Sequence, residues 1–509
     1  MRASNGNLAA LANAVLQPGF VGTVPPDWVR RLLGEGLGSV VLFSRNVVDP
    51  AQVSALTAAL RAERPEVIVA IDEEAGDVTR IEWVRGSSRP GNLALGMVDD
   101  PALTEEVARD LGAELAAAGV TLNYAPDADV NSNPDNPVIG VRSFGADAAL
   151  VSRHTTAWVR GLQSSGVAAC AKHFPGHGDT HVDSHHDLPR ITADRARLDA
   201  VELAPFRAAV AAGVQAVMTG HLLVPALDPQ LPATLSSRIL GGLLREELGF
   251  QGVVVTDGME MRAVSGQYGL PGAVVRALAA GADAICVGGE HADEQVVDQM
   301  REAIVAAVVA GELPEERLAE AAKRVGQLAA WTLAARTGSV GGRAGSVEGG
   351  FEGAGSRVGL AAARRAVRVT RTDGQRALPL VGAAHVVEFA PPHHLAIGTA
   401  TPWGVAAPLA ELLPGTTAVR YTEEATPADP SAGAAGRPLV LVVRDLHRHS
   451  WMRAAVDRAL ATRPDAVVVE LGVPALVTGP VHIATHGATR ACGRAAAEVL
   501  SGAADTPGW

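Results

Sequence analysis

The chain has 509 residues, 48% of them hydrophobic, so it can bury a large core and is expected to form more than one domain. No apolar run approaches the ~20 residues of a membrane span, and the first twenty residues are expected to begin the fold rather than to act as a signal peptide. The net charge of −12 argues against nucleic acid or a membrane as partner. The three cysteines, far apart in apolar segments, argue against a disulfide framework and favour the cytoplasm.

Short apolar segments alternate with amphipathic ones from the N-terminus to about residue 335. Strands are predicted within 8–20 and at 39–45, 67–72, 120–127, 167–174, 216–221, 252–258 and 282–289. Helices are predicted between them, for example at 101–119 and 235–249. This repeated alternation predicts an α/β fold, a (β/α)8 TIM-type barrel over residues 1–335. A doubly wound open sheet is the alternative, because a sequence does not reveal whether a sheet closes.

Polar side chains follow six of the predicted strands, namely Arg45, Asp72, Asp127, Lys172 with His173, His221 and Asp257. In barrel enzymes the residues at the carboxyl ends of several strands meet at one mouth. Any one of them could instead cap a helix or bind loop backbone. All six together favour a shared site.

Residues 336–358 are rich in glycine and serine, which predicts a linker or an exposed loop. A smaller α/β domain is predicted over 359–509, with strands at 367–372, 385–390, 438–445, 465–473 and 482–487 and helices at 450–463 and 489–502. Its polar residues near strand ends form no recognisable catalytic set, so a structural role is expected. They are Arg444, Asp445, His482 and His486.

The segment KHFPGHGDTHVDSHHD (172–187), called the histidine loop below, holds five of the fifteen histidines and one of the two lysines. A metal site is disfavoured because the spacings HxHxDH and HExxH are absent. A solvated loop with incidental histidines is disfavoured because Pro175, Gly176 and Gly178 fix an unusual backbone. The favoured interpretation is acid–base catalysis by an aspartate–histidine pair.

Asp183 and His185 are two positions apart, which places their side chains on the same side of an extended segment. A carboxylate bound to one imidazole nitrogen orients the ring and leaves the other nitrogen to transfer a proton. His186 and Asp187 are adjacent alternatives, and the spacing alone does not choose among them.

Asp257 follows the apolar run VVVT and precedes Gly258, so it is the best candidate for a nucleophile or an anionic stabiliser on another strand. Its alternative role is to cap the helix that follows. A fixed carboxylate opposite a proton donor suits displacement at an anomeric carbon with retention, in which Asp257 attacks while His185 protonates the leaving oxygen.

The histidine loop resembles the signature of family 3 glycoside hydrolases, in particular their β-N-acetylglucosaminidase branch. The resemblance extends over roughly residues 10–335. It includes LFSRN (42–46), IDEEAGDVTR (71–80), PVIGVRSFG (137–145) and GFQGVVVTDGMEM (249–261).

The resemblance implies that Asp257 is the nucleophile and that His185, oriented by Asp183, is the general acid and base. It assigns the binding of the terminal sugar to Asp72, Arg142, Lys172 and His173. The chain departs from the family pattern at Ala75 and Asp77, which replace a glycine and an arginine. If position 75 takes a positive φ, the alanine costs roughly 1 kcal/mol. Asp77 removes a positive charge near the expected mouth, which weakens the expectation of an anionic muramyl substrate.

These observations predict a retaining exo-β-N-acetylglucosaminidase that needs no metal or cofactor and acts on cell-wall (peptidoglycan) or chitin fragments. Because a neutral imidazole does not repel an incoming anion, a phosphorylase that uses inorganic phosphate is the alternative. A metal-dependent hydrolase and an inactive carbohydrate-binding relative are less favoured. The expected partner is a small carbohydrate.

Overall fold

The structure is a computed structural model that describes residues 5–181, 188–289, 293–338, 355–372, 378–392, 397–398 and 401–503. The chain divides into two compact units, which are described separately. The first unit comprises residues 1–73, 104–139 and 146–353, and the second comprises 74–103, 140–145 and 354–509. Two short segments of the N-terminal half therefore belong to the second unit. The bounds of 1–335 and 359–509 inferred from the sequence stay a prediction.

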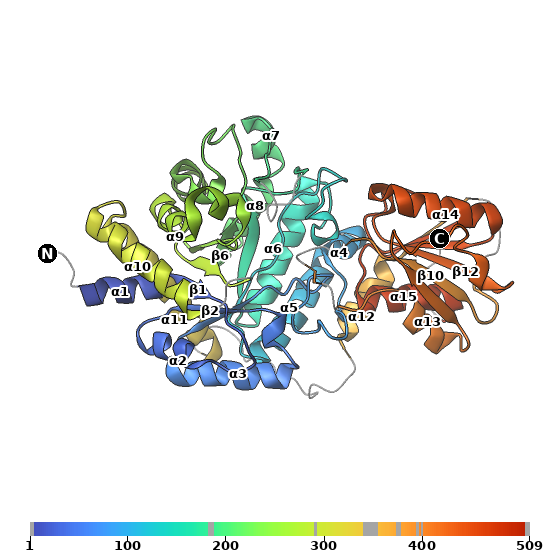
Figure 1. Cartoon of the computed structure of the whole chain (residues 1–509), viewed down its shortest axis with the longest axis horizontal. Coiled ribbons are helices and arrows are strands. Elements are labelled where there is room, and N and C mark those ends of the chain that lie inside the picture. Colours follow the sequence, from blue (N-terminus) through green and yellow to red (C-terminus); the bar gives the residue numbers. More distant parts are fainter. Residues whose placement is uncertain are drawn as a thin grey trace. The chain divides into compact units, whose positions relative to one another are not determined.

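The first unit is built on eight short parallel strands (Figure 1). They are β1 (Leu16–Pro18), β2 (Ser39–Leu42), β3 (Ile68–Ile71), β4 (Leu122–Asn123), β5 (Ala168–Phe174), β6 (Ala216–Thr219), β7 (Val253–Thr256) and β8 (Ile285–Val287). Strands β2 to β7 pair in sequence order, and β1 pairs with β8. A parallel bridge between Val255 and Ala284 joins β7 to the residue before β8, and Ser39 Oγ donates to Leu16 O between β2 and β1. The predicted (β/α)8 barrel is confirmed, and the open sheet is excluded.

Helices lie between the strands, as the alternation predicted. They are α1 (Asn5–Ala14), α2 (Asp27–Gly34), α3 (Pro50–Glu63), α5 (Pro101–Ala117), α6 (Ala148–Ser164), α7 (Arg195–Ala200), α8 (Ala204–Ala211), α9 (Arg262–Ala280), α10 (Glu294–Ala310) and α11 (Glu315–Arg336). The helix predicted at 235–249 is a π-helix over Arg238–Glu247. Its adjacent Gly241 and Gly242 weaken regular α-helix, because glycine loses the most backbone entropy on folding.

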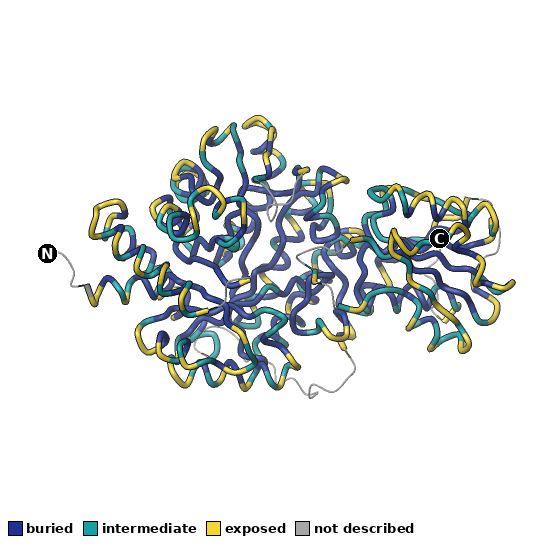
Figure 2. Tube along the Cα trace, in the orientation of Figure 1, coloured by how far each residue is buried: buried dark blue, intermediate teal, exposed yellow. Residues whose placement is uncertain are grey.

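The barrel strands are buried on both faces, as Figure 2 shows by their dark blue trace. This explains their near-continuous runs of Val, Ile, Leu and Ala, since parallel strands covered by helices have no solvated face. Tyr124, Cys170 and Cys286 belong to the buried cluster of the barrel. All three cysteines of the chain are buried and free.

The second unit contains a six-stranded sheet in the order β11-β10-β12-β13-β14-β9, in which only β9 is antiparallel. The strands are β9 (Arg368–Arg371), β10 (His385–Phe389), β11 (Thr417–Tyr421), β12 (Leu439–Val443), β13 (Val467–Glu470) and β14 (Val481–Ala484). Its helices are α4 (Asn92–Val98), α12 (Arg357–Ala366), α13 (Ala406–Leu412), α14 (Ser450–Thr462) and α15 (Arg490–Ser501). The predicted C-terminal α/β domain is thus present. Edge strand β11 escaped prediction because its side chains are mostly exposed and lack an apolar alternation.

Within the described part of the chain, the helices are too short or too polar for any of them to cross a bilayer.

Candidate active site

Lys172 and Asp72 meet at the carboxyl ends of β5 and β3. The Lys172 ammonium donates a hydrogen bond to Asp72 Oδ1. The lysine side chain is only 2% exposed, whereas the Asp72 side chain is 22% exposed. The pair therefore combines a buried cation with a carboxylate that a ligand can reach.

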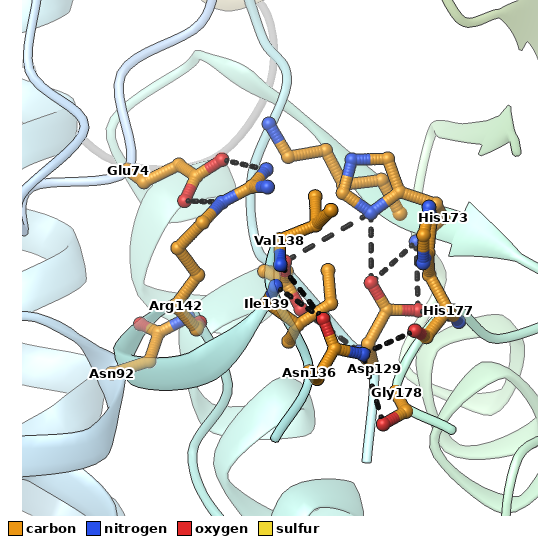
Figure 3. Close-up of polar contacts among 12 residues, drawn as sticks. Glu74, Asn92, Asp129, Asn136, Val138, Ile139, Arg142, His173, His177 and Gly178 are labelled. Carbon is orange, nitrogen blue, oxygen red and sulfur yellow. Dashed lines mark hydrogen bonds and ion pairs between the residues drawn. The ribbon is translucent and has the colours of Figure 1, made fainter. Parts of the chain in front are cut away.

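His173, the next residue of β5, is held by Asp129 (Figure 3). The Nδ1 atom of His173 lies 2.7 Å from Asp129 Oδ2, and the His173 backbone N–H also donates to this carboxylate. The backbone N–H of His177 donates to Asp129 Oδ1 over 2.7 Å. Burial by itself would raise the pKa of Asp129, but the two imidazoles and these hydrogen bonds hold the pKa below its ordinary value. Asp129 therefore stays anionic and fixes the orientation of the His173 ring.

Asp129 was missed by the sequence analysis, which considered only Asp127 in this segment. The sequence signal that could have identified Asp129 is its place two positions after Asp127, because alternate residues of an extended segment face the same side. Asp127 Oδ1 accepts a hydrogen bond from the Asp129 backbone N–H, and Asp127 also forms a parallel bridge with Lys172. The Asp129 carboxylate thus supports the end of β5 directly, whereas Asp127 does so through its backbone and by holding the Asp129 N–H.

Asp127, Asp129 and His173 each offer a ligand atom within 4.8 Å of the others, so these residues are the candidates for holding a metal ion. The side chains that would bind the metal already take part in hydrogen bonds. A metal would have to displace the Nδ1 proton of His173 and compete with the N–H donors to Asp129.

The glycines of the histidine loop permit close packing against a neighbouring segment. A Cβ on Gly178 would lie 1.7 Å from the carbonyl oxygen of Val130. Asn136 Nδ2 donates to the carbonyls of His177 and Gly178, over 2.9 Å and 3.0 Å. The start of the loop is therefore tied to residues 130–136. Asp183 and His185, the predicted acid–base pair, lie outside the described residues.

Asp257 directly follows β7 and is half-buried. Its backbone N–H donates to Thr219 O, and its Oδ1 accepts from the Gly258 N–H over 2.8 Å. The next helix, α9, begins only at Arg262 after Met261, which makes no side-chain cap. The alternative role of Asp257 as the cap of that helix is therefore excluded.

His221 and Arg45, two of the other strand-end residues, form hydrogen bonds with backbone carbonyl groups of the barrel loops. Imidazole Nε2 of His221 lies 3.0 Å from the Gly258 carbonyl. The Arg45 guanidinium donates to the carbonyls of Phe20, Gly288 and Gly289. The backbone after β8 forms a second set of hydrogen bonds, because Glu260 Oε1 accepts from the N–H groups of Gly288 and Gly289.

Arg142, the remaining predicted sugar-binding residue, belongs to the second unit. Its guanidinium makes a two-pronged ion pair with Glu74 over 2.7 Å and 3.0 Å, and both side chains are at least 94% buried (Figure 3). Asn92 Nδ2 donates to the Arg142 carbonyl. A role of Arg142 in binding the sugar stays a prediction.

The two departures from the family pattern also lie in the second unit. Ala75 adopts a φ of +63°, the left-handed conformation for which glycine is suited. The Asp77 carboxylate accepts from Arg444 over 2.5 Å and from the Ala488 backbone N–H over 2.8 Å. Arg444 therefore neutralises the charge that Asp77 introduces.

Strand-end carboxylates together with a buried lysine and a carboxylate-bound histidine define the class as a barrel enzyme with a polar site at the carboxyl ends of its strands. The model of the glycosyl hydrolase family 3 N terminal domain matches residues 24–328. The chain belongs to glycoside hydrolase family 3.

Two named relatives and one solved structure illustrate the similarity. Beta-hexosaminidase A of Pseudoalteromonas piscicida is 35% identical over 330 residues, covering 60% of this chain and 55% of that protein. A beta-hexosaminidase of Alkalilimnicola ehrlichii is 39% identical over 255 residues, covering 49% and 73%. The structure of a family 3 beta-N-acetylglucosaminidase from Paenibacillus sp. str. FPU-7 is 36% identical with a TM-score of 0.85, covering 97% of this chain and 96% of that one. The chain thus spans little more than half of the first of these relatives and nearly all of the last.

Proposed function

We propose that the protein is a retaining exo-β-N-acetylglucosaminidase that removes terminal N-acetylglucosamine from cell-wall or chitin fragments. The observation that carries the proposal is the hydrogen bond of buried Lys172 to partly exposed Asp72, beside His173 held by Asp129. Carboxylate, ammonium and imidazole are suited to bind sugar hydroxyls. The name of the solved structure supports the same sugar, and the names of the two relatives support a hexosaminide more generally.

In the proposed reaction an oxygen of Asp257 attacks the anomeric carbon, and the glycosidic C–O bond breaks as His185 gives its proton to the leaving oxygen. Asp183 orients His185. Water then attacks the glycosyl-enzyme, loses a proton to His185 and releases the sugar with its configuration retained. Asp72, Lys172, His173 and Arg142 hold the terminal sugar.

The proposal is tested with an aryl N-acetyl-β-glucosaminide. Asp257→Ala should lower kcat/KM by at least about 1,000-fold, whereas Glu246→Gln, on an exposed carboxylate of the same unit, should leave it unchanged. Azide should restore turnover to the Asp257→Ala protein and yield the α-glycosyl azide, because it enters from the face that the carboxylate has left. Near-normal activity of Asp257→Ala would show that the nucleophile is another group.

Inorganic phosphate is the alternative acceptor. A neutral imidazole does not repel it, so the second step could form a sugar 1-phosphate. Product analysis from chitobiose and from a muropeptide disaccharide, each with and without phosphate, separates the two reactions and identifies the preferred aglycone. Unchanged products and rate in the presence of phosphate would exclude the phosphorylase.

The cluster of Asp127, Asp129 and His173 favours one further control. Turnover in EDTA should equal turnover without it. Stoichiometric metal in the purified protein, with loss of activity on chelation, would support a metal-dependent hydrolase instead. Action on peptidoglycan fragments in the cytoplasm forms part of the same proposal.

A further inference from the structure

Glu202 is a buried carboxyl group between α7 and α8 of the barrel unit. The residue is only 1% exposed. Among the residues that the structure describes, no other residue gives its carboxyl oxygens a hydrogen bond, and the one donor that acts on them is its own backbone N–H. An ionised carboxylate in such a position loses most of its hydration and gains little in return. Its burial therefore suggests a role in the packing of the neighbouring segments.

The side chain of Glu202 supports the histidine loop at Gly176. A Cβ on Gly176 would lie 2.7 Å from Cβ of Glu202 and 3.1 Å from its Cγ, and Gly176 has a φ of +130°. The next residue is His177, whose N–H donates to Asp129, and Asp129 in turn holds His173. A displacement at Gly176 would therefore reach the ring of His173 through the His177 backbone and the Asp129 carboxylate.

Few charges act on Glu202. Asp179 of the histidine loop lies on one side, and Arg197 of α7 lies 3.9 Å from Asp179. The other charged residues of the flanking helices form ion pairs among themselves and with Glu247, and they are Arg195, Asp199 and Arg207. Burial is the main cause that raises the pKa of Glu202, its own backbone N–H and Arg197 oppose the rise, and Asp179 adds to it.

We propose that Glu202 is a positioning residue, which as a neutral acid supports residues 175–181 at Gly176 and on ionisation releases them. The neutral acid fits the buried site because it carries no uncompensated charge. The ionised form gains hydration only if the loop moves away and admits water. The proton on Glu202 and the packed position of residues 175–181 therefore stabilise each other.

The direction of the pH effect follows from this linkage. Because the packed loop raises the pKa of Glu202, packing is favoured below the ordinary pKa of a glutamate and is lost as pH rises through the raised value. The consequence for catalysis rests on the proposed function. The linkage between the proton on Glu202 and the packing of residues 175–181 does not depend on that function.

The test is hydrogen exchange of the full-length protein between pH 5 and pH 8, in peptides that lie within 173–181, after correction for the intrinsic pH dependence of exchange. The wild-type opening equilibrium should increase by at least about threefold over this range. Glu202→Gln, which keeps the shape without the charge, should show no increase and should match the wild-type protein at pH 5. Glu246→Gln is the matched control and should behave as the wild-type protein does.

A flat wild-type profile would overturn the proposal, and this outcome requires no variant to fold. An equal rise in Glu202→Gln would also overturn it, because the rise would then come from another group. Since exchange is measured without substrate, a positive result with an inactive protein would contradict the proposed function and leave this inference standing.

Discussion

His173 and Asp129 are joined by a hydrogen bond of 2.7 Å between Nδ1 and Oδ2, at the carboxyl end of β5. The same carboxylate accepts the backbone N–H groups of His173 and His177. One buried anion thus fixes a side chain at the end of β5 and the backbone of the loop that follows it. Such a partner sets the tautomer of the histidine, and its removal acts through the ring that it orients.

Asp129→Asn should therefore lower kcat/KM by about 10- to 100-fold. The amide keeps the volume of the carboxylate but turns an N–H₂ group toward at least one N–H donor. The measurement is turnover of the aryl glycoside. Glu246→Gln, on an exposed glutamate of the same unit, is the control. Activity within twofold of the wild-type value would show that the His173 ring needs no anionic partner.

Ala75 provides a prediction about stability. Its φ of +63° is unfavourable for a residue with a Cβ, so Ala75→Gly should raise the free energy of unfolding by up to about 1 kcal/mol. The control is Ala94→Gly inside helix α4, where glycine should lower stability by about 1 kcal/mol. Both are measured by urea-induced unfolding. A loss of stability in Ala75→Gly would mean that the backbone of this turn carries no strain.

The barrel could be predicted because its information is local. Apolar runs of strand length recur between amphipathic segments, and six of these runs are followed by a polar side chain. What those side chains contact could not be predicted in the same way. Arg45 and Asp72 look alike as strand-end residues, yet Arg45 donates to three backbone carbonyls while Asp72 binds Lys172. The choice depends on loops that the strand pattern does not describe.

Contacts between distant segments were also beyond the sequence. Asp77 could be recognised as a departure from the family pattern, but its partner Arg444 is 367 positions away. The roles of Asp183, His185 and Asp257 stay predictions, and they derive from the resemblance and from general chemistry.

The Asp77–Arg444 ion pair is buried, with side chains 2% and 12% exposed. Asp77→Asn should lower the free energy of unfolding by about 3 kcal/mol, because it leaves the arginine without its counter-charge. Arg444→Met should have a similar effect for the converse reason. The double variant should lose less than the sum of the two, and this difference in a double-mutant cycle measures the coupling. Additive effects would show that the two side chains do not stabilise each other.

Glu470, at the end of β13, makes the stability of the second unit depend on pH. Its carboxylate accepts from the backbone N–H groups of Asp445, Leu446 and Gly472 over 2.7–3.1 Å. Burial is the main cause that raises the pKa of Glu470 to about 7, and repulsion by Asp445 adds to it. Because the pKa is raised in the folded state, the contribution to stability is complete below the ordinary pKa of a glutamate. It is lost as pH rises through about 7.

Glu470→Gln cannot titrate. The difference between its melting temperature and that of the wild-type protein should therefore shift in favour of the variant as pH rises from 5 to 8. A loss of about 3 kcal/mol in the wild-type protein corresponds to several degrees in Tm. Any cost of the amide facing an N–H donor is the same at every pH and leaves this slope unchanged. Glu424→Gln, on an exposed glutamate of the same unit, should follow the wild-type curve. Parallel curves for Glu470→Gln and the wild-type protein would show that Glu470 stays ionised throughout, stabilised by its three backbone donors.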